Sequence, residues 1–277
     1  MISFSVKPLR SGSSGNLTLV EHAGTSLLVD AGLPSQRGLA AALSDAAVTW
    51  DDIDAVLVSH LHGDHIHPSA VACCARHEVP ILLHERNVRA FSRRILSRSA
   101  LSGPLRTFGG EPFSVGSIGV RPFAVPHDAE GVTCGFLLYA ATGGREVRVA
   151  MATDLGNGGN GLFERFVDSD LILIESNYDP LMLSGSRRLD RARVDSDVGH
   201  LSNEQAGKFL ARVMQESRKL PRAVVLCHLS ADHNTPALAT ATVRGILSRY
   251  GFGDIPVHAA RRDGPSPRFH ALEGGKK

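Results

Sequence analysis

The order of apolar runs along the chain limits its fold more than any other feature of the sequence. Short apolar runs separated by turn residues fill the first third, and mixed helix and strand signals follow. Strand signals return at residues 113, 118–124, 133–140 and 147–152, and helix and strand signals alternate again after residue 162. This order predicts two similar halves. Two such halves would pack sheet against sheet with helices outside, so we expect an α+β fold, a four-layer αββα sandwich.

The remaining elements are expected from local patterns. Strands are expected at residues 2–6, 17–21, 26–30, 55–59, 81–83, 171–175, 223–227 and 255–258. Helices are expected at residues 35–43, 69–77, 85–97, 162–167, 202–216 and 236–250, with a loop of about twenty residues after Glu175. We expect one domain over residues 1–260 and a loosely held C-terminal tail over residues 261–277, because the tail is rich in proline and glycine.

Composition and charge exclude several classes of protein. Hydrophobic residues make up 43% of the 277 residues, enough for a sizeable core, and the net charge of +2 creates no global field that would attract nucleic acid. The four cysteines form no CxxC pair, which favours reduced thiols. The chain shows no signal-peptide pattern and no apolar run near the ~18 residues of a membrane span. We therefore expect a cytoplasmic protein without a membrane partner, and a homodimer is left open.

The hexapeptide HLHGDH concentrates metal-binding side chains directly after the apolar run 55–59. It supplies four candidate ligands, His60, His62, Asp64 and His65. A lone histidine is more often structural, but four such groups in one short turn predict a metal site. Imidazole and carboxylate together suit zinc or another borderline divalent ion.

Three more candidates follow apolar strands further along the chain. His127, Asp154 and His228 each come directly after such a strand. Functional groups on α/β scaffolds gather at strand ends, where loops can bring them together. The shared position strengthens three signals that are weak one by one.

Taken together, these residues resemble the metallo-β-lactamase superfamily, whose signature HxHxDH matches HLHGDH. The resemblance extends over most of the chain and implies two divalent metal ions, with zinc as the first expectation and manganese as the alternative. It implies that the first ion is held by His60, His62 and His127, and the second by Asp64, His65 and His228. Asp154 is then the residue that bridges the two ions.

Four further segments narrow the resemblance. SGSSGN at 11–16, IESN at 174–177, GHLSNE at 199–204 and CHLS at 227–230 resemble the YycJ/WalJ (VicX) branch, which is related to ribonuclease Z and PhnP phosphodiesterases. The branch implies a binuclear metal-dependent phosphodiesterase, a DNA or RNA exonuclease in which a metal-bridging hydroxide attacks the phosphate. The alternatives are a thioester or lactone hydrolase of the glyoxalase II type, and a non-catalytic sensor or scaffold that keeps the metal site for stability.

His200 is our candidate general acid, and Asp64 and His200 together are the expected catalytic residues. The segment GHLS at residues 199–202 resembles a GHxS-type segment of ribonuclease Z. In that enzyme, the histidine of the segment lies beside the scissile phosphate. A helix expected from Ser202, with Gln205 as its capping-box partner, would add free backbone N–H groups. The structural alternative is a histidine that only packs where the helix begins. Two groups of arginines could contact nucleic acid: 187, 188, 191 and 193 in the loop after Glu175, and 86, 89, 93, 94 and 98 on one helix face.

Overall fold

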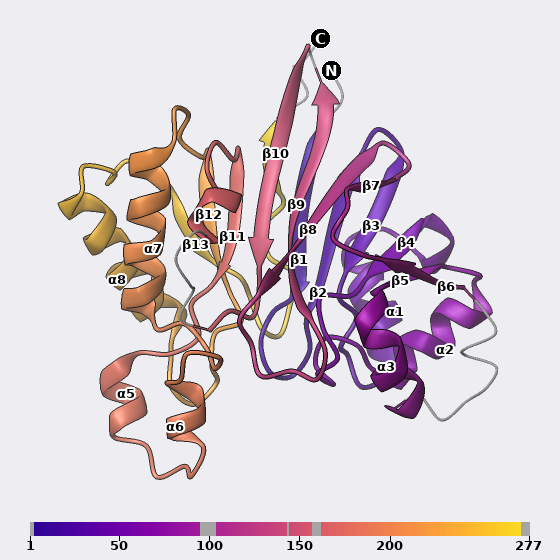
Figure 1. Ribbon diagram of the computed structural model, residues 1–277, viewed down its shortest axis with the longest axis horizontal. Helices are drawn as coiled ribbons and strands as arrows, with labels where there is room; N and C mark the ends of the chain where they lie inside the picture. The colour runs from indigo at the N-terminus through magenta and orange to yellow at the C-terminus, as the bar shows by residue number, and fades with distance from the viewer. Residues whose placement is uncertain (1–2, 95–103, 143, 157–161, 273–277) are drawn as a thin grey trace.

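Two seven-stranded sheets form the centre of the computed structural model, which describes residues 3–94, 104–142, 144–156 and 162–272 (Figure 1). The first sheet has the order β14-β1-β2-β3-β4-β5-β6. Its strands are β1 (Phe4–Arg10), β2 (Leu17–His22), β3 (Thr25–Val29), β4 (Ala55–Leu57), β5 (Ile81–His84), β6 (Leu105–Phe108) and β14 (Phe269–Leu272). The second sheet has the order β13-β12-β11-β10-β9-β8-β7. Its strands are β7 (Phe113–Val115), β8 (Ile118–Val125), β9 (Thr133–Thr142), β10 (Arg145–Ala152), β11 (Leu171–Glu175), β12 (Ala223–Cys227) and β13 (Val257–Ala259).

The two sheets repeat one pairing pattern. In the first sheet β1, β2 and β3 pair antiparallel, and β3 to β6 continue as parallel neighbours. In the second sheet β7 to β10 pair antiparallel, and β10 to β13 continue as parallel neighbours. Parallel strands need helical crossovers, so each half carries helices where its parallel strands lie. The repeated pattern confirms the expectation of two similar halves.

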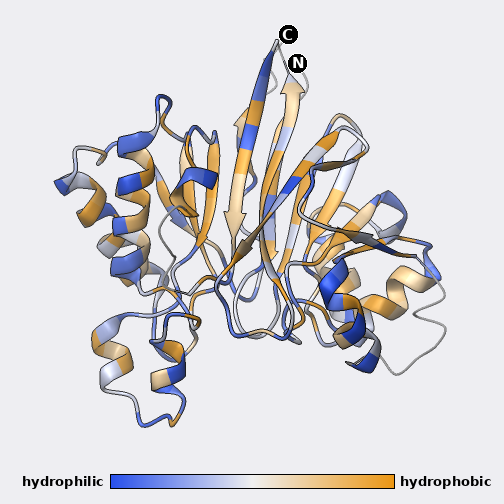
Figure 2. Cartoon of the chain, viewed as in Figure 1, coloured by the Kyte–Doolittle hydropathy of each residue, from blue (hydrophilic) through white to orange (hydrophobic). Residues whose placement is uncertain are grey.

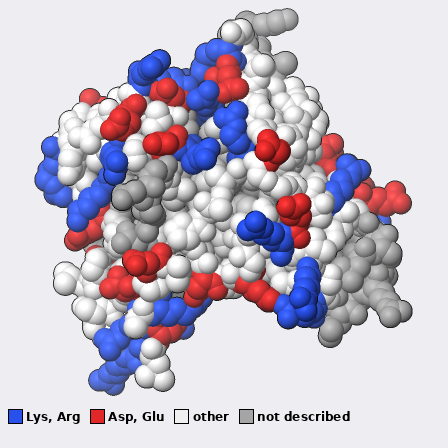
Figure 3. All heavy atoms as spheres, viewed as in Figure 1, with Lys and Arg blue, Asp and Glu red and all other residues white. Residues whose placement is uncertain are grey.

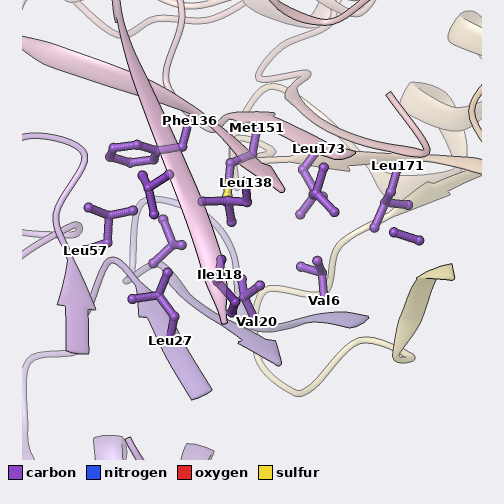
Figure 4. Packing of buried hydrophobic residues seen from close by; sticks show 14 of the residues in the cluster. Val6, Val20, Leu27, Leu57, Ile118, Phe136, Leu138, Met151, Leu171 and Leu173 are labelled. Carbon is purple, nitrogen blue, oxygen red and sulfur yellow. The ribbon is translucent and has the colours of Figure 1, made fainter. Parts of the chain in front are cut away.

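The core lies between the facing sheets. Figure 4 shows Val20, Leu27 and Leu57 of the first sheet packed against Ile118 and Phe136 of the second. All five side chains are buried. Because removal of apolar surface from water is the main force that joins two sheets, this layer holds the two halves together.

Helices cover the outer face of each sheet. Helices α1 (Gln36–Ser44), α2 (Pro68–Arg76) and α3 (Val88–Arg94) lie on the first sheet, and α7 (Asn203–Glu216) and α8 (Pro236–Arg249) lie on the second. Their inward faces are apolar and their outward faces polar, as Figure 2 shows. Each set of helices buries its own apolar cluster against its sheet. The predicted four-layer αββα sandwich is confirmed.

Two segments differ from expectation. The tail was expected to be loosely held, but β14 pairs antiparallel with β1 and buries Phe269 and Ala271. The alternation of Phe269 and Ala271 toward the core outweighs the proline and glycine content before them. Residues 273–277 lie outside the described part of the chain. The loop after Glu175 contains two short helices, α5 (Pro180–Ser184) and α6 (Arg191–Val194), which protrude beyond the end of α7 (Figure 1).

Other boundaries shift by a few residues. The helix expected at 85–97 begins as the 3-10 turn η2 (Glu85–Asn87) and continues as α3, and its end from residue 95 lies outside the described residues. The helix expected at 162–167 is the 3-10 turn η3 (Leu162–Arg165), and a further 3-10 turn, η1 (Trp50–Asp52), precedes β4. Strand β6 was not expected. Within the described residues, no helix combines the length and the apolar content that crossing a membrane requires.

Candidate metal centre

The seven candidate ligands come together at one edge of the sandwich, on loops that follow strands. The HLHGDH segment follows β4 of the first sheet. The other three residues follow strands of the second sheet: His127 after β8, Asp154 after β10 and His228 after β12. Within this set, groups of three side chains bring their potential ligand atoms within 4.8 Å of one another. The cluster is therefore assembled from both sheets.

The first group consists of three imidazoles. Nδ1 of His62 lies 3.1 Å from Nε2 of His60 and 3.2 Å from Nε2 of His127. Two nitrogens bound to one zinc ion at 2.0–2.1 Å in tetrahedral geometry would lie roughly 3.3 Å apart. The three nitrogens thus have the spacing of a shared metal ion.

Neighbouring groups fix the orientation of two of these rings. Nδ1 of His60 lies 3.0 Å from the hydroxyl of Ser59, and Nδ1 of His127 lies 3.0 Å from the carbonyl oxygen of Gly199. The carbonyl can only accept, so Nδ1 of His127 donates this hydrogen bond and Nε2 is the ring atom that faces His62. Such contacts are typical of imidazoles that bind metal ions.

The second group consists of Asp64, His65 and His228. Oδ2 of Asp64 lies 3.2 Å from Nε2 of His228 and 3.8 Å from Nε2 of His65. The main chain of Asp64 is tightly packed, because the backbone of Gly32 lies directly against it. A Cβ at position 32 would lie 1.8 Å from the carbonyl oxygen of Asp64, so only glycine fits there.

Asp154 lies between the two groups. Its Oδ2 is 2.5 Å from Nε2 of His65 and 3.5 Å from Nε2 of His60. Both carboxylate oxygens are buried, and neither makes a hydrogen bond of acceptable geometry. A buried carboxylate that lacks well-aligned hydrogen bonds needs positive charge nearby, which the imidazoles of His65 and His228 can supply when protonated and metal ions can supply when bound. The donor set therefore fits a carboxylate shared by two metal ions.

The histidines of the two groups differ in the direction in which their pKa values are shifted. Burial lowers the pKa of His62 to about 4 and lowers that of His60 well below its usual value. In the second group burial acts in the same direction, but the neighbouring carboxylates outweigh it. Asp154 and Asp30 raise the pKa of His65 to about 10, and Asp154 raises that of His228 well above its usual value. The imidazoles of His60 and His62 are thus neutral at neutral pH, the state that binds a metal ion.

Sequence reasoning did not single out Asp30 and Glu175 as site residues. Oδ2 of Asp30 accepts from Nδ1 of His65 at 2.7 Å, and both oxygens bind Ser59. Oε1 of the buried Glu175 lies 2.7 Å from Nδ1 of His200 and 3.1 Å from Nδ1 of His228. Both carboxylates follow or end a buried apolar strand, the same position as Asp154. That shared position is the signal that could have found them.

His200 lies beside the seven residues. Its Nδ1 is 3.2 Å from Oδ1 of Asp154, in addition to its contact with Glu175. Burial lowers its pKa, but Glu175 and Asp154 together outweigh burial and raise it to about 9. Ser202, two residues on, caps α7 and shares a reciprocal capping box with Gln205, as expected.

The arginines after Glu175 lie on the protruding α5–α6 unit, which we define as residues 178–199. Figure 3 shows Lys and Arg gathered over this unit at the lower left. Arg193 donates from Nη2 to Oδ1 of Asp128 at 2.9 Å, which ties the unit to the residue after His127. In the other group of arginines, Arg93 of helix α3 forms an ion pair with Glu130. Arg98 of that group lies outside the described residues.

Comparison with known proteins identifies the family. Residues 25–229 match the family model described as a beta-lactamase superfamily domain. The exodeoxyribonuclease YycJ of Bacillus anthracis is 31% identical over 254 residues, which cover 91% of each chain. The exodeoxyribonuclease WalJ of Streptococcus pneumoniae is 30% identical and covers 96% of this chain and 97% of its own.

Solved structures share the fold at lower identity. The metallo-beta-lactamase fold protein YhfI of Bacillus subtilis superimposes with a TM-score of 0.71 at 16% identity, over 97% of this chain and 99% of its own. A diphosphatase of the PhnP family gives 0.65 at 13% identity over 98% and 99%, and the short form of human tRNase Z gives 0.62 at 17% over 95% and 98%. The chain belongs to the metallo-β-lactamase superfamily of metal-dependent hydrolases, in its YycJ/WalJ branch.

Proposed function

We propose that the protein is a binuclear metal-dependent phosphodiesterase, an exonuclease that acts on DNA or RNA. Relatives named exodeoxyribonucleases, about 30% identical over more than nine-tenths of the chain, support this proposal. The observation that carries it in the structure is the placement of His200 beside Asp154 and Glu175, outside the seven candidate ligands.

The proposed ligands divide as the geometry of the side chains suggests. His60, His62 and His127 would hold one ion, Asp64, His65 and His228 would hold the other, and Asp154 would serve both. Zinc suits this set of imidazoles and carboxylates, and manganese is the alternative. When bound, such ions would lower the pKa of a water molecule and offset the charge that develops on a phosphoryl oxygen.

The protein itself would supply the proton for the leaving group. Glu175 engages Nδ1 of His200 at 2.7 Å, so Nε2 is the ring atom available to a substrate. The carboxylate fixes the ring orientation and stabilises the protonated imidazole, as a buried acid does for a histidine in hydrolases. Oε2 of Glu175 is in turn held by the backbone N–H groups of Leu155 and Leu201. His200 would therefore be a rigidly positioned general acid, and Asp64 the second expected catalytic residue.

An assay of two reaction classes tests the proposal. The metal-loaded protein should hydrolyse bis-p-nitrophenyl phosphate and end-labelled single-stranded DNA or RNA, and it should leave S-lactoylglutathione essentially untouched. Efficient cleavage of the thioester without cleavage of any of the three phosphodiesters would make the glyoxalase II-type activity correct instead. A matched Asp154→Ala protein controls for contaminating nucleases, because it should be inactive on all four substrates.

A further inference from the structure

The segment SGSSGN at residues 11–16 has no role in the proposed function, although it lies against the metal centre. It connects β1 to β2, and we refer to it as the β1–β2 loop. Ser11 and Asn16 at its two ends are buried, whereas the two serines in its middle are exposed. Buried polar side chains need hydrogen-bond partners, and the partners of these two residues lie among the proposed metal ligands.

Two glycines close the β1–β2 loop on itself. Gly12 and Gly15 have φ values of 145° and 142°, a region that glycine reaches without the strain other residues meet. The N–H of Gly15 donates to the carbonyl oxygen of Gly12 at 2.9 Å, and the N–H of Gly12 donates to Oδ1 of Asn16 at 2.9 Å. Because these bonds join the start of the loop to its end, the positions of Ser11 and Asn16 are coupled.

Ser11 holds the main chain of His228. Its Oγ accepts from the N–H of His228 at 2.9 Å, and Nδ2 of Asn177 donates to the carbonyl oxygen of His228 at 2.8 Å. His228 has a φ of 54°, a left-handed conformation that persists in a residue other than glycine where neighbouring groups fix it. Since the backbone sets the direction of the side chain, this contact helps to direct the imidazole toward Asp64.

Asn16 holds the main chain of Asp64. Its backbone N–H and its Nδ2 both donate to the carbonyl oxygen of Asp64, at 2.7 and 3.1 Å. Nδ2 also lies 2.9 Å from Nε2 of His65. Oδ1 of Asn16 accepts from the N–H of Gly12, so the amide group is oriented with its nitrogen toward Asp64 and His65.

The β1–β2 loop thus contacts all three proposed ligands of the second ion, Asp64, His65 and His228. Among the hydrogen bonds of the described residues, none joins this loop to the three histidines of the first group. Asp64 follows β4 of the first sheet, and His228 follows β12 of the second. One loop therefore connects ligands that come from different sheets.

We propose that the β1–β2 loop is a positioning element for the second ion, in which Ser11 and Asn16 set the separation between His228 and Asp64. The inference rests on the proposed function, because it concerns one of the two ions proposed there. Ser11 and Asn16 act through the ligands that they hold. Their removal weakens binding of the second ion and leaves binding of the first unchanged.

Zinc titration of one site at a time tests this without an activity assay. The His127→Ala background leaves the second ion and the Asp64→Ala background leaves the first, and competition with a chromogenic chelator measures each affinity. In the His127→Ala background, Ser11→Ala and Asn16→Ala should each weaken zinc binding on the order of tenfold. In the Asp64→Ala background neither should change it. The absorption spectrum of the cobalt-loaded His127→Ala protein should change in both variants.

The control is Ser13→Ala, Ser14→Ala, which removes two exposed hydroxyls from the same loop and should leave both affinities unchanged. Asn16→Ala carries the test alone if Ser11→Ala does not fold, as judged by the circular dichroism of the metal-free protein. Equal weakening of both ions would show a general loosening of the site and overturn the proposal. Unchanged affinity for the second ion, or a His127→Ala protein that binds no zinc, would overturn it as well.

A double variant tests whether the loop acts as one unit. Ser11→Ala and Asn16→Ala combined should lose less affinity for the second ion than the product of the two single losses, because either change alone already releases the coupled loop. A loss equal to that product would overturn the assignment to a single element. If these variants respond as expected but the unchanged protein cleaves no phosphodiester, the proposed function fails and the role of the loop stands.

Discussion

Oδ2 of Asp30 accepts a hydrogen bond from Nδ1 of His65 at 2.7 Å, and this contact turns Nε2 of the imidazole toward Asp154. Asp30 directly follows strand β3 and has a φ of 61°, a left-handed conformation that aspartate and asparagine tolerate better than most residues. The same carboxylate binds the backbone and the hydroxyl of Ser59, so it joins the end of β3 to the start of the HLHGDH segment.

Asp30→Asn should therefore weaken metal binding without unfolding the protein. Asparagine keeps the size and tolerates the backbone angle, but it removes the charge that orients and polarises His65. Contacts of this kind typically contribute 10–100-fold to metal affinity. Competition titration with a chromogenic chelator measures the change. Asp30→Ala adds backbone strain and should also lower the melting temperature, whereas an unchanged affinity in both variants would show that Asp30 does not support the metal centre.

The proposed ligand set predicts two divalent ions per chain. Purified protein reconstituted with zinc or manganese should contain two ions by elemental analysis. His127→Ala should retain about one ion, because it removes a ligand of the first group only. Asp154→Ala should reduce occupancy at both positions, since its carboxylate lies between the groups. A content of one ion in the unchanged protein that added metal cannot raise would contradict the binuclear proposal.

His200→Ala should lower the rate of nucleic-acid cleavage by ~10²–10⁴-fold while both ions and the fold are retained, because a positioned general acid contributes about that much. The loss should be smaller on bis-p-nitrophenyl phosphate, since p-nitrophenolate leaves without a proton. Glu175→Gln is the matched variant and should show the same dependence on the leaving group. Equal losses on both substrates would assign His200 to phosphate binding, and loss of metal would assign it to the structure of the site.

A pH-dependent stability is expected at His22, far from the metal centre in the chain. Burial lowers its pKa, and its ring nitrogens lie 2.9 Å from the hydroxyls of Ser117 and Thr142. Since the unfolded chain binds a proton at this histidine more readily than the folded one, its contribution to stability is present above the usual pKa of 6.5 and is lost as pH falls below it. The stability lost in His22→Gln should therefore be largest near pH 8 and shrink toward pH 5. Urea unfolding at several pH values measures this, and a difference that does not vary with pH would contradict the assignment.

Much of the architecture could be predicted because buried strands and helices produce regular patterns of apolar residues in the sequence. Apolar strands such as Leu171–Ile174 are unmistakable, and the HLHGDH segment lies where a strand ends. Strand β14 was missed because it is short and follows proline and glycine, and its pairing with β1 is a contact across more than 260 residues that local patterns do not carry. Asp30 and Glu175 were missed for a related reason. A carboxylate at a strand end looks the same in the sequence whether it faces water or an imidazole, and only the packing of the loops distinguishes the two.

The origin of the seven proposed ligands in both sheets has a mechanical consequence. Four lie on the first sheet's loop and three follow strands of the second, so bound ions would act as a cross-link across the sandwich. Sliding or parting the two halves would require the ions to leave first. A ligand present at 100 times its dissociation constant adds about 2.7 kcal/mol to the stability of the state that binds it. Ions bound at the edge of the sandwich would therefore resist separation of the two sheets. A chelator would weaken the contact between the halves before either sheet unfolded.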